Sequence, residues 1–278
     1  MKLNRMKANE LLCILLVFLL SACGSGPNTP LPPPNIQASN LFYGVNAKFY
    51  VGVTELNNGI TFSVSNCSDF GQITSPSPLY LAYSCLVTAT GSMLFTAKDA
   101  VGNQILTKNY TVPEPQVNVL TDLGSIVLEL NPTSAPVSVK NFLRYVQDGF
   151  YTGSIFHRVI PGFVVQAGGF TSGLNPKTPS YGPINLESQN GLSNLRGTLA
   201  MARTSDPNSA TSQFYVNLQD NLNLDYSDPN NLGYAVFGKV LSGQDVIDKI
   251  ATTPTLSLNG YSDVPANDIV ITSVTRTQ

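Results

Sequence analysis

Short hydrophobic runs that alternate with polar residues fill the first half of the chain beyond residue 35. Alternation with a period of two predicts β-strands, and the clusters of Gly, Pro, Asn and Asp that bound these runs favour turns. The expected strands cover residues 48–53, 60–64, 80–88 and 93–96, and the expected turns cover 57–59, 69–71, 75–78 and 101–103. This pattern predicts a small all-β, sandwich-like domain over residues 36–113.

The pattern changes after the Pro-rich segment 112–115, which we interpret as a domain boundary. An apolar stripe at helical spacing begins at Pro136 and ends at Gly149, and a second, short helix is expected over 244–250 with Ser242 as its N-cap. The expected strands of this half cover residues 117–120, 126–130, 156–160, 163–166, 197–202, 213–218, 236–240 and 269–275. Such a series of strands with two helices predicts a mainly β fold, a closed antiparallel barrel over residues 114–278.

One predicted hairpin, over residues 156–170, carries polar residues in an otherwise apolar setting. Arg158 and Gln166 are separated by an even number of residues, so a hairpin can bring both onto one face beside Phe163. A cationic donor next to an apolar wall suits a neutral ligand that combines a polar amide with an apolar ring. A peptide bond that precedes proline has this chemistry.

The first residues have the pattern of an export signal. Basic residues precede an apolar run over 11–20, which is too short to span a bilayer because about 20 residues are needed. The sequence Leu20-Ser21-Ala22-Cys23 follows, and it resembles the bacterial lipobox, in which the Cys thiol is acylated and the chain is cleaved before it. Residues 1–22 would then be a lipoprotein signal peptide; the alternative is an ordinary signal peptide cut near Ala22.

An acylated Cys23 would anchor the protein to a membrane without crossing it. Residues 23–35 are rich in Gly and then in Pro, which is typical of a tether. Gly24 replaces the Asp that retains enteric lipoproteins at the inner membrane. We therefore expect a location in the bacterial cell envelope, on the outer membrane facing the periplasm.

Charge and cysteine content bear on three further properties: nucleic-acid binding, disulfide formation and metal binding. Charged residues make up 12% of the chain and the net charge is -2, with no basic patch, so a nucleic-acid-binding function is not expected. Cleavage would remove Cys13 and lipid would occupy Cys23, which leaves Cys67 and Cys85 to form a disulfide worth about 3 kcal/mol. Two buried free thiols are the alternative. Two cysteines and the single histidine, His157, form no metal-ligand set.

The barrel half resembles the cyclophilin family of peptidyl-prolyl isomerases, in its bacterial periplasmic branch. The resemblance runs from about Val117 to the C-terminus and depends on several blocks in the same order. These blocks are Phe142, residues 156–163, Gln166 with Gly168, and residues 196–203, 209–215 and 233–240. It implies an eight-stranded barrel with two helices, proline-containing polypeptides as substrates, and no cofactor.

The resemblance also implies roles for individual residues. Arg158 would be the catalytic arginine and Gln166 its catalytic polar neighbour. The residues expected to bind substrate are Phe163, Val164, Ala202, Arg203, Gln213, Tyr215, Leu224 and Tyr234. Val164 replaces the usual Met and Tyr215 the usual Phe, changes that could lower activity or alter preference, and Ala167 stands where Gly is usual. Asn223 occupies the position of a Trp in eukaryotic members, so we expect weak cyclosporin binding.

Rotation about an X-Pro bond requires no nucleophile, base or metal, because the barrier comes from amide resonance. Arg158 can donate to the prolyl nitrogen as it becomes pyramidal, and its charge is permanent. Adjacent in sequence, His157 should face away from Arg158 and serve as a structural, hydrogen-bonded residue. We expect a monomeric isomerase that assists folding of exported proteins. The alternatives are a non-catalytic X-Pro binding module and a main function in docking by the N-terminal domain.

Overall fold

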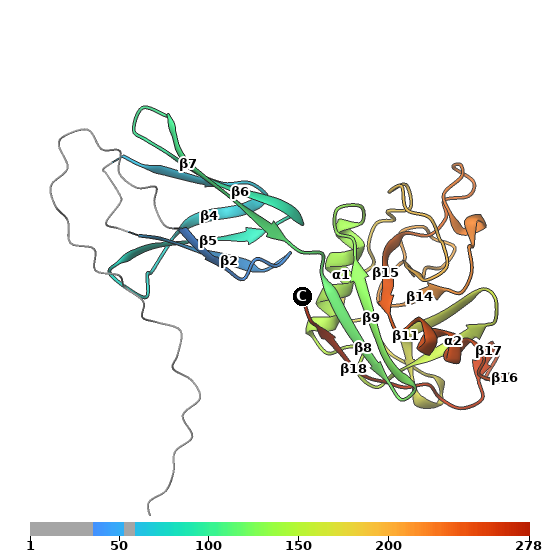
Figure 1. Cartoon of the computed structure of the whole chain (residues 1–278). Coiled ribbons are helices and arrows are strands. Elements are labelled where there is room, and N and C mark those ends of the chain that lie inside the picture. Colours follow the sequence, from blue (N-terminus) through green and yellow to red (C-terminus); the bar gives the residue numbers. More distant parts are fainter. Residues whose placement is uncertain (1–35, 53–58) are drawn as a thin grey trace, which may run out of the picture. The chain divides into compact units, whose positions relative to one another are not determined.

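A computed structural model of the protein describes residues 36–52 and 59–278 (Figure 1). The predictions for the signal peptide, for Cys23 and its tether, and for most of the turn at 57–59 lie outside the described residues. Within the described ranges, no helix is long and apolar enough to cross a membrane.

Residues 36–112 form two antiparallel sheets, which we call the N-terminal β domain (Figure 1). One sheet has the order β1 (Ile36–Ser39), β2 (Asn46–Gly52), β5 (Tyr80–Val87) and β4 (Cys67–Ile73). The other has the order β3 (Thr61–Val64), β6 (Gly91–Lys98) and β7 (Gln104–Val112). Phe49 of the first sheet and Met93 and Phe95 of the second are fully buried in one shared core, because alternate residues of each strand point inward. The sandwich-like arrangement is as expected.

The turn expected at residues 69–71 is wrong. These residues lie inside β4, where the pairing with β5 shifts register between Ser68 and Gly71. Asp69 has a φ of 55°, in the left-handed region that Asp tolerates better than most residues. The turn-like sequence therefore forms a bulge within a strand, which bends the strand without ending it.

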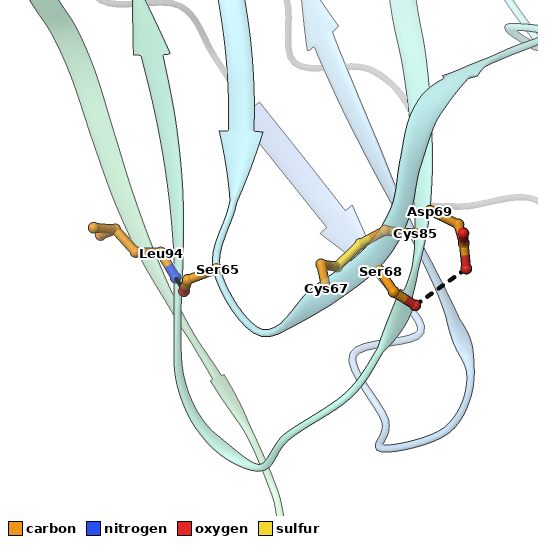
Figure 2. Close-up of a disulfide and its surroundings, with 6 residues drawn as sticks. All are labelled: Ser65, Cys67, Ser68, Asp69, Cys85 and Leu94. Carbon is orange, nitrogen blue, oxygen red and sulfur yellow. Dashed lines mark hydrogen bonds between the residues drawn. A yellow bond between two sulfur atoms is a disulfide. The ribbon is translucent and has the colours of Figure 1, made fainter.

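A disulfide joins β4 to β5, through Cys67 and Cys85 (Figure 2). Their Cα atoms are 5.6 Å apart, within the range that a disulfide spans. In the same region the Ser65 hydroxyl accepts a hydrogen bond from the Leu94 amide at 2.8 Å, which ties the loop before β4 to β6 of the opposite sheet.

The second part of the chain, which we call the barrel domain, is a nearly closed eight-stranded antiparallel barrel. The strand order around it is β10 (Ser154–Ile160), β11 (Val164–Thr171), β14 (Phe214–Asn217), β13 (Thr198–Met201), β15 (Val236–Ser242), β9 (Gly124–Leu130), β8 (Gln116–Thr121) and β18 (Ile271–Arg276). A bridge between Ile155 and Val270 links the two ends of this order, and the short β12 (Asn175–Pro176) adds to β11. The predicted barrel is confirmed.

The two helices contribute side chains to the barrel core. α1 (Pro136–Gln147) begins with proline in its first turn and buries Phe142 and Tyr145. α2 (Gln244–Ala251) buries Ile247 and Ile250. Both helices were predicted from the sequence, α1 from its apolar spacing.

The predicted N-cap of α2 is wrong. Ser242 is the last residue of β15, and the cap is Gly243, which has a φ of 87° and offers no side-chain hydrogen bond. A Cβ at this position would come 2.4 Å from the Ser125 carbonyl oxygen. The close approach of two backbones, rather than a capping side chain, therefore fixes where the helix begins.

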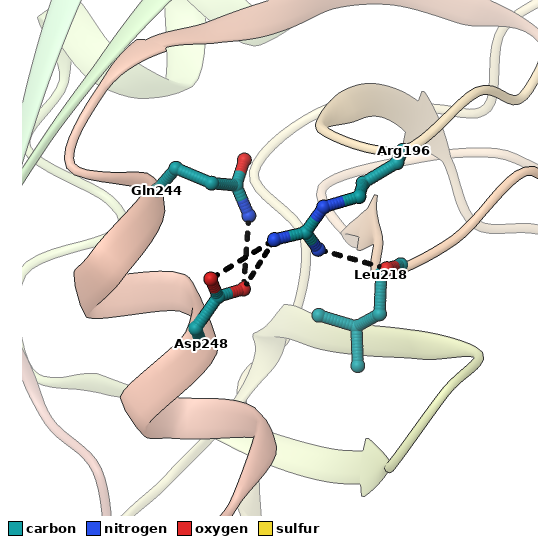
Figure 3. Close-up of polar contacts among 4 residues, drawn as sticks. All are labelled: Arg196, Leu218, Gln244 and Asp248. Atoms are coloured by element: carbon teal, nitrogen blue, oxygen red, sulfur yellow. Dashed lines mark hydrogen bonds and ion pairs between the residues drawn. The ribbon is translucent and has the colours of Figure 1, made fainter.

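An ion pair ties α2 to the turn before β13 and to the end of β14 (Figure 3). Arg196 donates to both carboxylate oxygens of Asp248, at 2.9 and 3.0 Å, and to the Leu218 carbonyl oxygen at 2.9 Å. Gln244 donates to the same carboxylate at 3.2 Å. Both charged side chains are about half exposed, so the contact fixes geometry more than it adds stability.

Sequence reasoning missed one hairpin of the barrel domain, β16 (Thr255–Leu258) with β17 (Tyr261–Pro265). Its turn is Asn259-Gly260, with φ values of 51° and 81°. Asn-Gly between two β-forming runs is a strong hairpin signal, so the sequence carried the information needed to find it.

Candidate active site

A pocket of about 110 Å³ opens on the barrel domain, small enough to suit a single ring. The residues that line it come from β10, β11, β14 and the loops around β13 and β15. They are Arg158, Phe163, Val164, Gln166, Ala202, Arg203, Tyr215, Leu224 and Tyr234. The structure thus brings together in one pocket the catalytic and substrate-binding residues that the sequence selected, except Gln213. Gln213 does not line the pocket and instead contacts Gln166.

The hairpin of β10 and β11 holds Arg158 and Gln166 opposite each other. The two residues are direct partners in the strand register, so their side chains leave the sheet on the same face. Gly162 has a φ of 69° in the connecting turn, and the Phe163 amide closes that turn by donating to the Ile160 carbonyl at 3.0 Å. The turn places the ring of Phe163 at the edge of the pocket.

Gln213 fixes the orientation of the Gln166 amide. Gln166 Nε2 donates to Gln213 Oε1 at 2.9 Å. The Gln213 side chain lies so close to Gly169 that a Cβ there would be 2.4 Å from its Cδ atom. Glycine at position 169 is therefore needed for Gln213 to reach Gln166, and Gln213 acts on the pocket through this contact.

An apolar cluster forms part of the pocket and supports it from the barrel strands. Val164, Ala200, Tyr215 and Val236 form a buried cluster, each from a different barrel strand. The rings of Tyr215 and Tyr234 meet edge to face with their centroids 5.8 Å apart. These surfaces can hold a small apolar ring and exclude water from it.

The hydroxyl of Tyr215 is bonded within the protein. It donates to Asn194 Oδ1 at 2.8 Å, and Asn194 is fully buried. Burial raises the pKa of Tyr215, so the phenol stays neutral. The departure from the family's usual Phe therefore leaves the pocket floor as an aromatic ring and adds a hydrogen bond beneath it.

A network of buried asparagines lies under the pocket, and sequence reasoning missed it. Asn217 donates to Asn194 at 3.1 Å, and Asn221 donates to Asn217 at 2.8 Å and to the Phe163 carbonyl at 2.9 Å. Asn194 also donates to Asp225 at 2.8 Å. The network links the strand that bears Tyr215 to the turn that bears Phe163. Buried amides whose partners lie far apart in the chain carry no periodic signal that a sequence could show.

Arg203 supports the rim of the pocket. Its Nε and Nη2 atoms donate to the Gly233 carbonyl at 3.0 and 2.9 Å, and its guanidinium carbon lies 4.5 Å from the centroid of the Tyr234 ring. A Cβ at Gly233 would come 2.4 Å from the Tyr226 amide, so this turn has no room for a side chain. The guanidinium is thus engaged in holding the loop that presents Tyr234.

His157 is buried, 6% exposed, whereas the neighbouring Arg158 is partly exposed, as strand alternation predicts. Its ring packs 4.6 Å from that of Phe170, measured between centroids. Burial lowers its pKa to about 4. The expected hydrogen bonding is incomplete, since Nδ1 has no partner among the described residues.

The comparisons with known proteins agree on one family. The model of the family described as cyclophilin type peptidyl-prolyl cis-trans isomerase/CLD matches residues 116–276. A peptidyl-prolyl cis-trans isomerase of Acinetobacter baylyi is 49% identical over 170 residues, 61% of this chain and 89% of the relative. Peptidyl-prolyl cis-trans isomerase A of Dickeya dadantii is 53% identical over 157 residues, 56% of this chain and 82% of the relative. A solved cyclophilin of Cryptosporidium parvum, in the presence of the dipeptide Ala-Pro, is 28% identical, with a TM-score of 0.48 over 59% of this chain and 99% of that one.

Proposed function

Because the chain belongs to the cyclophilin-type peptidyl-prolyl cis-trans isomerase family, we propose that it accelerates rotation about X-Pro bonds in proteins exported to the bacterial envelope. The observation that carries this proposal is the juxtaposition of the partly exposed Arg158 with aromatic and aliphatic side chains, Phe163 and Leu224 among them, around a pocket of about 110 Å³. The pocket accommodates the proline ring, and the guanidinium lies where the prolyl nitrogen of a bound peptide can reach it.

The mechanism follows from what limits the uncatalysed reaction. Amide resonance sets a barrier of about 18–20 kcal/mol, and the resonance is lost in the twisted state as the nitrogen becomes pyramidal. Arg158 donates to the lone pair that appears on that nitrogen, an interaction absent from the planar ground state. The walls formed by Phe163 and Tyr215 hold the ring still while the acyl side rotates.

Gln166 contributes to substrate binding in this mechanism. One amide hydrogen is directed to Gln213, which orients the group, and the side chain lines the pocket. Its amide oxygen and second hydrogen can bind the backbone of the peptide next to the proline. No step requires a side chain to change its protonation state, and His157, neutral above a pKa of about 4, takes no part.

A prolyl isomerisation assay tests this function. The protein without residues 1–23 should accelerate isomerisation of a tetrapeptide with Ala before Pro. Arg158→Ala should lower kcat/KM at least about tenfold, a loss of about 1.4 kcal/mol of transition-state stabilisation. Arg144→Ala, which removes an arginine that lies over Tyr181 outside the pocket, is the matched control and should keep wild-type activity.

Two results would contradict the proposal. Equal activity of Arg158→Ala and wild type would remove Arg158 from catalysis. No acceleration by folded wild-type protein would favour the alternative, an X-Pro peptide or protein binding module, which is supported by Val164 and Tyr215 in place of the usual Met and Phe. We also propose that the protein binds cyclosporin weakly, because Asn223 stands at the position of the Trp in eukaryotic members. We propose that the protein is a monomer.

We further propose that the mature protein is held on the outer membrane, facing the periplasm, by lipid on Cys23. The lipobox-like segment 20–23 supports the anchor, and the Cys67–Cys85 disulfide suits an oxidising compartment. Mass spectrometry of the protein from membranes should find acyl chains on Cys23 and no free thiol at 67 or 85. Recovery of unacylated protein with a chain beginning near residue 23 would mean an ordinary signal peptide instead.

A further inference from the structure

The β16–β17 hairpin, which sequence reasoning missed, packs beside β10, the strand that carries Arg158. A small hydrophobic cluster, separate from the main barrel core, fixes it there. Val264 of β17 is 2% exposed and packs with Ile155 of β10 and Phe170 of β11. The hairpin is thus anchored to both strands of the site.

Val264 directly follows Asp263 in β17, and Tyr261, two residues before Asp263, provides a second anchor. The ring of Tyr261 meets the ring of Phe170 edge to face at 5.2 Å, and Phe170 in turn packs against His157, the residue next to Arg158. Asp263 therefore lies between two residues that are both held on the Phe170 side of the site.

The backbone at Asp263 has an unusual shape. The pairing of β16 with β17 shifts register between Leu256 and Leu258, opposite Asp263, which indicates a bulge. Asp263 has a φ of 61°, in the left-handed region that side chains other than Gly, Asn and Asp seldom adopt. Bulges of this kind redirect a side chain and are common next to active sites.

The bulge aims the carboxylate at the candidate catalytic residue. Asp263 Oδ2 is 3.9 Å from Arg158 Nε. The two side chains are 39% and 41% exposed, so solvent screens their attraction and the pair adds little to stability. Its effect is on direction: the carboxylate of Asp263 lies near the Nε atom of a guanidinium whose residue also lines the pocket.

We propose that Asp263 is a positioning residue for Arg158, which holds the guanidinium in the orientation that meets the prolyl nitrogen. The inference rests on the proposed isomerase function. A flexible arginine samples many rotamers and loses that freedom when it binds the transition state. An arginine that is already held in place avoids this entropic cost. The other arginine of the pocket, Arg203, is oriented by hydrogen bonds to the Gly233 carbonyl, whereas the charged contact of Arg158 is the ion pair with Asp263.

The test is a double-mutant cycle on the full chain purified in detergent. Asp263→Asn keeps the size of the side chain and tolerates the left-handed backbone, and Asp263→Gly tolerates it as well. Arg158→Lys keeps the charge at the catalytic position but loses the planar fork. Asp245→Asn, which breaks an exposed pair with Lys249 on α2, is the control that removes one equal charge elsewhere.

Asp263→Asn and Asp263→Gly should each lower kcat about 3- to 10-fold with KM within about twofold of wild type. In the Arg158→Lys background the same substitutions should change kcat less than about twofold, because Asp263 acts through the guanidinium. Asp245→Asn should match wild type, and melting temperatures should be unchanged.

Equal fold-losses in both backgrounds would overturn the proposal, since they would indicate an effect that bypasses Arg158. A rise in KM alone would also overturn it and make Asp263 a contact for the peptide. Failure of the proposed function is a separate outcome. It would appear as no activity in the wild type, or as wild-type activity in the Arg158→Lys single variant.

Discussion

At the scale of single residues, Tyr215 serves two purposes with two parts of one side chain. Its ring lines the pocket and its hydroxyl holds Asn194 in the buried network below. The sequence identified the position as a pocket wall through the family resemblance. It did not reveal the direction of the hydroxyl, because Asn194 lies 21 residues away and only the fold brings the two together.

Tyr215→Phe should therefore affect stability more than catalysis. Removing the hydroxyl leaves Asn194 Oδ1 with its contact to Asn217 alone, and the free energy of unfolding should fall by about 1–2 kcal/mol. The ring remains, so kcat/KM should stay within about threefold of wild type. Urea denaturation and the isomerase assay measure the two effects, with Tyr50→Phe in the N-terminal β domain as the control. A large gain in activity without loss of stability would show that the hydroxyl obstructs the pocket.

At the scale of elements, the structure distinguishes features that local sequence decides from those that packing decides. The apolar spacing of α1 and the apolar runs of β10 and β11 on either side of a turn predicted those elements, because each is a signal that the local chain displays by itself. The start of α2 was misjudged, since it is set by contact of Gly243 with Ser125 of another strand. The turn-like sequence at Asp69 became a bulge because its neighbour β5 continued the pairing.

The β16–β17 hairpin shows the same division within one element. Its Asn-Gly turn is a local signal, so its existence was predictable. Its place beside Arg158 was not, because the cluster of Val264, Ile155 and Phe170 joins residues from three strands. The candidate positioning residue Asp263 thus follows from tertiary packing.

At the scale of the whole molecule, the buried His157 couples stability to pH. Its pKa is about 4 in the folded protein and about 6.5 in an unfolded chain. Between these values the unfolded chain binds a proton that the folded protein does not, so stability falls as pH falls. The free energy of unfolding should decrease by about 3 kcal/mol from this group between pH 7 and pH 4.

Urea denaturation of wild type and His157→Gln at several pH values measures this contribution, because carboxylates titrate in both proteins and only the difference reports His157. The two curves should run parallel above pH 7 and converge below it as wild type loses stability. Parallel curves over the whole range would contradict the buried, neutral imidazole. Isomerase activity between pH 6 and 8 should not follow this titration.

The sequence by itself determined the class of both domains and the identity of the residues around the pocket. Strand periods are local, and the motif blocks that contain Arg158, Gln166 and Tyr215 are contiguous, so both could be found without a fold. Only the tertiary structure decided how these residues are supported: the Gln213 contact behind Gln166, the asparagines beneath Tyr215, and the carboxylate of Asp263 beside Arg158. Such contacts join positions far apart in the chain, and their distances and directions exist only after the barrel has closed.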